Sequence, residues 1–365
     1  MSPIRLLVVA ITLTLTTAPN AGAQTGGQIP VFQVDPSWPQ WPEAWIQGAS
    51  AGIATDKLDH VWIIHRPASV TDKRACCKPA PAVIEFDSAG KLLQSWNGAG
   101  EGYQWPSENN EHGIFVDYQN NVWIAGRGAN GTSENQILKF DNQGKFLLQI
   151  GRRGSGNNSN DTGNLGQPAD MTVYPQTKEL FVADGYGNRR VIVFDADSGA
   201  YKRHWGAYGN KPDDAAPKTP LFHGPGDAQF NQVHHVRIST DGLVYVADRL
   251  NRRIQVFRID GTFVKEAFVR RDSTETAGTV SSLAFSGDPQ QQFLYVADQA
   301  ENRILILDRQ TFEELGSLGR LGRYAGQFVS PHNITTDSKG NLFVAEDFGG
   351  QRVQKFTFKG LATRR

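Results

Sequence analysis

Val244-Tyr245-Val246 is one of six short segments in which an aromatic residue stands between two aliphatic β-formers. The other five are Val61-Trp62-Ile63, Val122-Trp123-Ile124, Leu180-Phe181-Val182, Leu294-Tyr295-Val296 and Leu342-Phe343-Val344. They recur at intervals of 48 to 64 residues along the 365-residue chain. Short runs of this composition predict β-strands, and their recurrence indicates a repeated structural unit.

Each unit contains more than this one strand. An apolar run and a polar turn precede the aromatic segment, as in Gly52-Ile53-Ala54-Thr55 before Asp56-Lys57-Leu58-Asp59, which predicts a hairpin. A third strand follows, for example Arg253-Ile254-Gln255-Val256-Phe257, and Tyr201 to Trp205 shows a fourth. Four antiparallel strands per unit, without helical periodicity between units, are typical of propeller blades. The sequence therefore predicts an all-β, six-bladed β-propeller.

The sixth unit lacks an outer strand of its own, because it stops after Arg352 to Phe358 and a few polar residues. The N-terminal segment Ile29 to Asp35 has strand character. We expect it to pair with the sixth unit and close the ring, since closure also covers an exposed sheet edge. Residues 24–365 are accordingly predicted to form a single propeller domain.

The first 23 residues are predicted to be a signal peptide. Arg5 precedes the apolar run Leu6 to Leu15, and the small residues Ala21-Gly22-Ala23 follow as a cleavage site. No later stretch approaches the roughly 20 apolar residues that span a bilayer, so we expect a periplasmic or extracellular protein without a membrane segment.

Lys+Arg and Asp+Glu balance at 37 each, with no basic block. Nucleic acid is therefore not an expected partner.

The two cysteines, Cys76 and Cys77, are adjacent. They cannot join distant segments, so we expect a disulfide that staples the local loop in an oxidising compartment, with a reactive or metal-binding pair as the alternative.

A second recurring pattern combines an aspartate with a following Asn-Arg pair. Because it recurs in several units, we interpret it as turn hydrogen bonds and ion pairs rather than as catalytic carboxylates. Its members are Asp184 with Asn188-Arg189, Asp248 with Asn251-Arg252 and Asp298 with Asn302-Arg303.

Three histidines stand at one equivalent position, the start of the first strand of a unit. They are His112, His234 and His332, in units two, four and six, whereas units one, three and five have the small residues Ala51, Ala169 and Ser281 there. Alternate blades of a six-fold ring are about 120° apart, so the three imidazoles should converge on the central channel. Three imidazoles with an open fourth position are typical of catalytic zinc. The alternatives are histidines that hold a water network, and His235 in place of His234.

Three further side chains should line the mouth above these histidines. Second strands end on the face where first strands begin, and at those ends stand Arg66, Tyr186 and Arg249. Guanidinium groups bind carboxylates, and a phenol beside a cation and a metal can act as a base. The alternative is that both arginines are solvated loop charges. Tyr186 lies in the turn Gly185-Tyr186-Gly187, which has no core to fill.

These residues also carry a resemblance to a known family. Nearly the whole predicted mature chain resembles the propeller lyase domain of the peptidyl-α-hydroxyglycine α-amidating lyases, which is built from NHL repeats. Generic NHL propellers share the strands but not the matching motifs. These are Ile64-His65-Arg66, His112-Gly113, Val182-Ala183-Asp184-Gly185-Tyr186-Gly187-Asn188, Val246-Ala247-Asp248-Arg249 with Arg253-Ile254-Gln255, and Pro331-His332.

The resemblance implies that His112, His234 and His332 hold zinc and that Arg66, Tyr186 and Arg249 serve catalysis and substrate binding. It implies cleavage of an N-acyl α-hydroxyglycine, a carbinolamide, into a primary amide and glyoxylate. In this reaction Tyr186, assisted by Arg66, takes the hydroxyl proton and Arg249 holds the carboxylate. Another carbinolamide, such as a ureidoglycolate-like compound, is the alternative substrate.

The chain departs from the family at several places. Ser330 replaces a methionine, and the loop Pro67 to Ala82 is an insertion. Asn333 replaces an aspartate of a structural calcium site, and loss of that charge should weaken calcium binding. The main alternative function is a non-catalytic NHL scaffold or sensor that binds a protein partner through the propeller face. A calcium-dependent hydrolase of the lactonase type is disfavoured, because carboxylates rather than imidazoles should then fill the channel.

Overall fold

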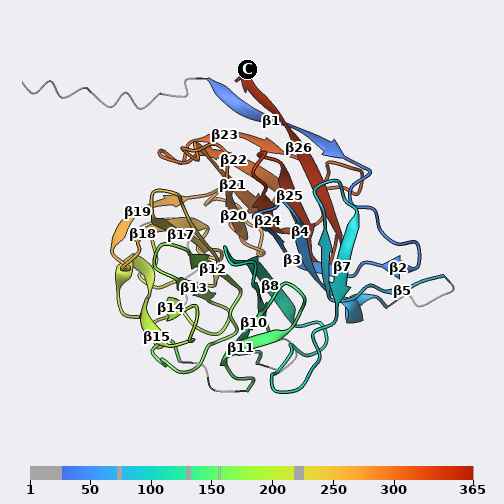
Figure 1. Ribbon diagram of the computed structural model, residues 1–365. Helices are drawn as coiled ribbons and strands as arrows, with labels where there is room; N and C mark the ends of the chain where they lie inside the picture. The colour runs from blue at the N-terminus through green and yellow to red at the C-terminus, as the bar shows by residue number, and fades with distance from the viewer. Residues whose placement is uncertain are drawn as a thin grey trace, which may run out of the picture.

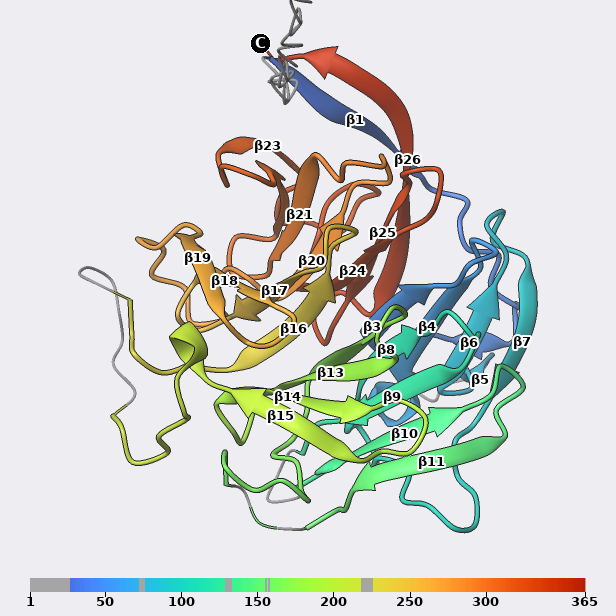
Figure 2. The same cartoon turned by 60° about the vertical axis from the view of Figure 1, so that its left-hand side comes forward.

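Six antiparallel sheets of four strands each are arranged around a common centre in the computed structural model (Figures 1 and 2). The structure describes residues 27–71, 76–128, 133–154, 156, 158–217 and 226–364. Within them there is no α-helix, only the 3₁₀ turns Pro67–Ser69 and Ala207–Gly209, and no helix has the length and apolarity of a membrane span. The predicted six-bladed β-propeller is confirmed. The predicted signal peptide, residues 1–23, lies outside the described residues.

The blades follow one another along the chain, each beginning with its innermost strand. Blade 1 contains β3 (Ala49–Thr55), β4 (Val61–Arg66), β6 (Val83–Phe86) and β7 (Leu92–Trp96), and blade 2 contains β8 (Glu111–Val116), β9 (Val122–Gly126), β10 (Gln136–Phe140) and β11 (Phe146–Gly151). Blade 3 contains β12 (Asp170–Tyr174), β13 (Glu179–Asp184), β14 (Arg190–Asp195) and β15 (Tyr201–Trp205), and blade 4 contains β16 (Val233–Ile238), β17 (Leu243–Asp248), β18 (Arg253–Arg258) and β19 (Phe263–Phe268). Blade 5 contains β20 (Ser282–Phe285), β21 (Phe293–Asp298), β22 (Arg303–Asp308) and β23 (Glu314–Leu318).

Blade 6 joins the two ends of the chain. Its first three strands are β24 (Pro331–Thr336), β25 (Leu342–Glu346) and β26 (Arg352–Thr363), and its fourth is β1 (Gln28–Asp35), which pairs antiparallel with β26. The two strands run side by side in both views (Figures 1 and 2). The predicted closing strand is thus confirmed.

The hydrophobic core is divided among the six blade interfaces. Each aromatic residue of the second strands is at most 1% exposed and packs toward a neighbouring blade. Trp123 of blade 2, for example, belongs to one cluster with Met171 and Leu180 of blade 3. At the closing interface Phe32 of β1 meets Tyr295 of blade 5, with ring centroids 5.6 Å apart. Because apolar side chains fill the interfaces, polar residues can face the centre of the ring.

The recurring aspartates form buried ion pairs in two blades, but with different arginines from those predicted. Asp184 Oδ2 accepts a hydrogen bond of 2.8 Å from Arg190, and Asp248 Oδ2 accepts one of 2.7 Å from Arg253. These arginines lie directly opposite the aspartates across the strand pairs, whereas Arg189 and Arg252 donate to backbone carbonyl oxygens of loops.

Blade 5 departs from this pattern. Arg303 lies opposite Asp298 across the strand pair, but the ion pair of Asp298 is formed by Nε of Arg270, 3.5 Å from Oδ2, and not by the predicted Arg303. Burial raises the pKa of Asp298 to about 7, because Arg270 compensates the buried charge only in part.

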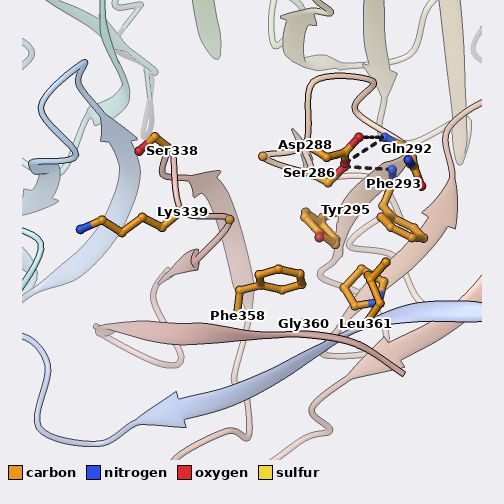
Figure 3. A pocket seen from close by; sticks show the side chains of 13 residues that line it. Ser286, Asp288, Gln292, Phe293, Tyr295, Ser338, Lys339, Phe358, Gly360 and Leu361 are labelled. Atoms are coloured by element: carbon orange, nitrogen blue, oxygen red, sulfur yellow. Dashed lines mark hydrogen bonds between the residues drawn. The ribbon is translucent and has the colours of Figure 1, made fainter. Parts of the chain in front are cut away.

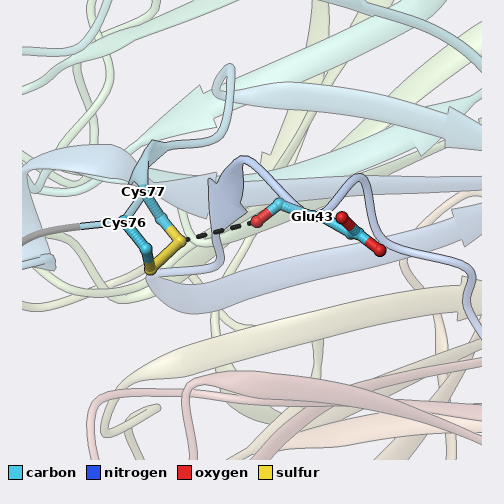
Figure 4. Close-up of a disulfide and its surroundings, with 3 residues drawn as sticks. All are labelled: Glu43, Cys76 and Cys77. Atoms are coloured by element: carbon cyan, nitrogen blue, oxygen red, sulfur yellow. Dashed lines mark hydrogen bonds between the residues drawn. A yellow bond between two sulfur atoms is a disulfide. The ribbon is translucent and has the colours of Figure 1, made fainter.

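Cys76 and Cys77 form a disulfide with each other, as expected of a local staple (Figure 4). Cys77 Sγ lies 3.5 Å from the carbonyl oxygen of Glu43. The following strand β5 (Lys78–Pro79) pairs in parallel with β2 (Trp45–Ile46). The disulfide therefore lies where the loop after β4 is fastened to the segment before β3.

A cavity of about 410 Å³ lies between blade 5 and the β1–β26 ribbon (Figure 3). Phe293, Tyr295, Phe358 and Leu361 give it a largely apolar lining. It contains none of the residues predicted for the functional site.

Candidate metal centre and its surroundings

The three predicted histidines each lie at an irregularity in the first strand of their blade. The pairing of β8 with β9 shifts register between Glu111 and Ile114, and the corresponding shifts in blades 4 and 6 flank His234 and His332. A bulge leaves the extra residue outside the strand pairing and redirects its side chain. Here it lets each imidazole turn toward the centre of the ring.

The imidazoles of His112, His234 and His332 meet there. Their ring centroids are 4.8 to 5.2 Å apart, and each residue is at most 2% exposed. One ligand nitrogen from each ring lies within 4.8 Å of the others. His235 instead contacts the neighbouring blade 5, where its Nε2 lies 3.0 Å from Ser282 Oγ and its Nδ1 accepts a hydrogen bond from the backbone of Leu283. The alternative of His235 as a member of the cluster is therefore wrong.

Backbone carbonyl oxygens fix the protonation of all three rings. Nδ1 of His112 donates to Ala169 O at 2.8 Å, that of His234 to Ser281 O at 2.6 Å, and that of His332 to Ala51 O at 2.8 Å. The acceptors are the small residues that occupy the equivalent position in the three intervening blades. With the proton on Nδ1, each Nε2 presents its lone pair to the centre, as a metal ligand must.

The electrostatic environment keeps these imidazoles neutral. Burial is the largest cause and lowers the pKa of His332 to about 4, and it holds the pKa of His112 and His234 well below the ordinary value. The neutral ring is the form that binds metal. Three neutral, buried imidazoles, each oriented by a hydrogen bond from Nδ1 to a backbone carbonyl oxygen, fit a zinc ion with an open coordination position.

Tyr186 lies directly over the cluster. Its hydroxyl oxygen is 3.0 Å from Nε2 of His112 and 2.9 Å from Nε2 of His234. The preceding Gly185 permits this position, because a Cβ there would lie 2.1 Å from the carbonyl oxygen of Val233. The glycine thus lets the turn after β13 approach β16 closely enough for the phenol to reach the ring centre.

Arg249 and Arg66 lie on the same side of the cluster, and neither is a solvated loop charge. Arg249 Nη1 is 3.5 Å from the Tyr186 hydroxyl, while its Nε donates to Ala277 O at 2.6 Å and its Nη2 donates to Gln299 Oε1. Arg66 is 1% exposed. Its Nε donates to Glu111 O at 2.9 Å, and its Nη1 pairs with Asp347.

Three further residues at the ends of second strands border the site, although no role in it was predicted for them from the sequence. Asp347 pairs with Arg66 and its Oδ2 lies 3.9 Å from Nε2 of His332. Gln299 accepts from Arg249, and the Arg127 guanidinium lies over the Tyr186 ring, 4.6 Å from its centroid. Arg127 and Arg249 both follow the second strand of a blade, so position alone could have indicated Arg127.

Two other places bear on metal binding. Asn333, expected at a calcium site, accepts a hydrogen bond of 3.3 Å from the backbone of Ile53 through Oδ1. Calcium binding stays a prediction. Asp56, His60 and Glu85 form a second cluster of ligand types. Asp56 accepts from the Trp62 indole at 3.2 Å, and Asp117 repeats this contact with Trp123 at 2.9 Å, so the Asp56 contact belongs to the blade structure.

Comparison with known proteins finds similarity to β-propellers and to NHL repeat-containing proteins. Residues 188–330 match the family model "Lactonase, 7-bladed beta-propeller", although the whole ring has six blades. NHL repeat-containing protein 3 from Homo sapiens is 28% identical over 89% of this chain and 84% of its own. A probable peptidyl-alpha-hydroxyglycine alpha-amidating lyase from Caenorhabditis elegans is 22% identical over 82% of this chain and 80% of its own.

A solved structure of a streptogramin B lyase superimposes with a TM-score of 0.50 at 13% identity, over 91% of this chain and 98% of that one. At this identity the likeness concerns the fold alone. The chain is thus a six-bladed β-propeller that is similar to NHL repeat-containing proteins.

Proposed function

We propose that this protein is a zinc-dependent lyase that cleaves a carbinolamide of the α-hydroxyglycine type into an amide and glyoxylate. The observation that carries the proposal is the Tyr186 hydroxyl, held at 3.0 and 2.9 Å from the Nε2 atoms of two of three converging histidines. A proton-transfer group thus lies beside a set of ligands suited to zinc. The lyase from Caenorhabditis elegans named above supports the same reaction class.

His112, His234 and His332 would hold the metal through Nε2. Zinc bound there would supply a Lewis acid that polarises the substrate hydroxyl. Tyr186 takes the hydroxyl proton, the carbon–oxygen double bond of glyoxylate forms, and the carbon–nitrogen bond breaks with its electron pair moving to nitrogen. Tyr186 then returns the proton to that nitrogen, so the products are a primary amide and glyoxylate.

The two arginines bind and orient the substrate. Arg249, whose Nη1 is 3.5 Å from the Tyr186 oxygen, receives the carboxylate next to the reacting carbon. Arg66 is fixed by Glu111 O and Asp347, so its guanidinium is held rigidly beside the cluster, where it assists Tyr186. Burial of the three imidazoles excludes water from the side of the site below the substrate.

The proposal is tested with N-benzoyl-α-hydroxyglycine and the zinc-loaded protein. We expect benzamide and glyoxylate in equal amounts, at a rate well above the reaction without protein, and no product from N-benzoylglycine, which lacks the hydroxyl. Liquid chromatography measures the amide, and an aldehyde reagent measures glyoxylate. If neither product exceeds the background, the lyase proposal is wrong and the non-catalytic scaffold is favoured.

A further inference from the structure

Arg127 is an arginine of the site that has no carboxylate partner among the described residues and no role in the mechanism above. It follows β9 and its guanidinium carbon lies 4.6 Å from the centroid of the Tyr186 ring. Its Nε is buried without a hydrogen-bond partner, and no carboxylate among the described residues pairs with it. A guanidinium that stacks on a ring through its face keeps its N–H edge free for a planar anion.

The other two arginines of the site, Arg66 and Arg249, are held by hydrogen-bond or ion-pair partners. Asp347 neutralises Arg66, and Arg249 is held by Ala277 O and Gln299 while its Nη1 faces the Tyr186 hydroxyl. Arg249 can therefore receive the single carboxylate of an α-hydroxyglycine. Arg127, which lies over the Tyr186 ring, is then still without a carboxylate partner.

The position of Arg127 is close enough to the cluster to act on a bound substrate. The guanidinium carbon of Arg127 lies 4.6 Å from the centroid of the Tyr186 ring. The hydroxyl of the same tyrosine contacts Nε2 of His112 and Nε2 of His234. Arg127 therefore flanks the part of the site in which the reacting bonds of a carbinolamide would lie.

We propose that Arg127 forms a second carboxylate-binding position and that the preferred substrates carry a second carboxylate on the acyl side of the carbinolamide. This inference rests on the proposed lyase function for the identity of the reacting group. A carboxylate at the end of a short acyl chain would pair with Arg127 while the glycine carboxylate pairs with Arg249. The substrate class is thus an acidic N-acyl α-hydroxyglycine.

The first test compares two substrates of nearly equal length, N-succinyl-α-hydroxyglycine and the uncharged-chain analogue N-butyryl-α-hydroxyglycine. We expect the wild type to have about tenfold or higher kcat/KM for the succinyl compound, and Arg127→Gln to lose this preference. Arg127→Lys should retain part of it. Arg258→Gln, which removes an exposed charge at the far end of β18, should retain all of it.

The ratio of the two kcat/KM values separates a binding role from a structural one. A variant that merely displaces Tyr186 would slow both substrates by the same factor and leave the ratio unchanged. A wild type without preference for the succinyl compound, or a preference that survives in Arg127→Gln, would overturn the proposal.

A binding experiment tests the inference independently of catalytic turnover. N-succinylglycine and N-butyrylglycine lack the hydroxyl and cannot react, so calorimetry on the zinc-loaded protein measures binding alone. We expect tighter binding of N-succinylglycine, weakened about tenfold by Arg127→Gln but not by Arg258→Gln. Equal affinity of both acids would contradict the second carboxylate position, whatever the turnover assay shows. Selective binding without any turnover would refute the lyase and leave the anion site in place.

Discussion

Replacing Tyr186 with phenylalanine is expected to lower the rate of glyoxylate release by about 10² to 10⁴-fold, the usual effect of losing a proton-transfer group. The substitution removes only the hydroxyl that lies 3.0 and 2.9 Å from the two imidazoles. The ring remains, so the stacking with Arg127 and the approach of the Gly185 turn to β16 should persist. The kcat of the zinc-loaded variant on N-benzoyl-α-hydroxyglycine measures the effect.

Tyr324→Phe is the matched control, because this tyrosine is 80% exposed and lies far along the chain in the loop before blade 6. It should keep the wild-type rate. Zinc content and circular dichroism should be unchanged in both variants. Retention of wild-type activity by Tyr186→Phe, with its zinc and fold intact, would remove Tyr186 from the mechanism.

Loss of the closing strand is expected to destabilise the whole ring. Deletion of residues 24–36 removes β1 and its pairing with β26, and it exposes Phe358 and Tyr295, which Phe32 now covers. The free edge of β26 should also promote aggregation. The point variant Phe32→Ala isolates the contribution of side-chain packing. It should reduce the free energy of unfolding by about 1 to 2 kcal/mol, less than at a core position because Phe32 is only partly buried.

Thermal unfolding followed by circular dichroism checks both changes. Val31→Ala is the control, because the neighbouring Val31 is 38% exposed and alternates to the outer face of the strand. It should leave the melting temperature nearly unchanged. A melting temperature that stays at the wild-type value after deletion of residues 24–36 would show that β1 does not hold the ring closed.

The strand pattern was predictable because it depends on local alternation and on spacing. Val244-Tyr245-Val246 and its five counterparts all form second strands with a buried aromatic residue. The outer position of Ile29 to Asp35 followed from the missing fourth strand of blade 6. These inferences need only the pairing rules of antiparallel sheets.

The finer geometry depends on features that a linear sequence does not show. The choice between His234 and His235 rests on a bulge, which decides which of two neighbouring side chains faces the ring centre. The partner of Arg66 is Asp347, 281 positions away, and the two meet only because the ring closes. The buried partners of Asp184 and Asp248 were misassigned by one residue, because cross-strand register selects Arg190 and Arg253.

The role of the small residues at the histidine position also could not be predicted from the sequence. Ala51, Ala169 and Ser281 are notable in the sequence only as non-histidines at the histidine position. In the structure their carbonyl oxygens accept the Nδ1 protons of the histidines in adjacent blades. Since any residue has a carbonyl group, residue type alone carries no signal for this contact.

The central claim is that His112, His234 and His332 hold one zinc ion, and elemental analysis of the purified protein tests it most directly. The account predicts about one zinc per chain in the wild type, as in other three-histidine sites. It predicts loss of that zinc in His112→Ala, His234→Ala and His332→Ala, with retention in the control His204→Ala, which alters an outer strand of blade 3. A wild type that binds no zinc even when the ion is supplied, or three folded variants that keep the full amount, would contradict the account.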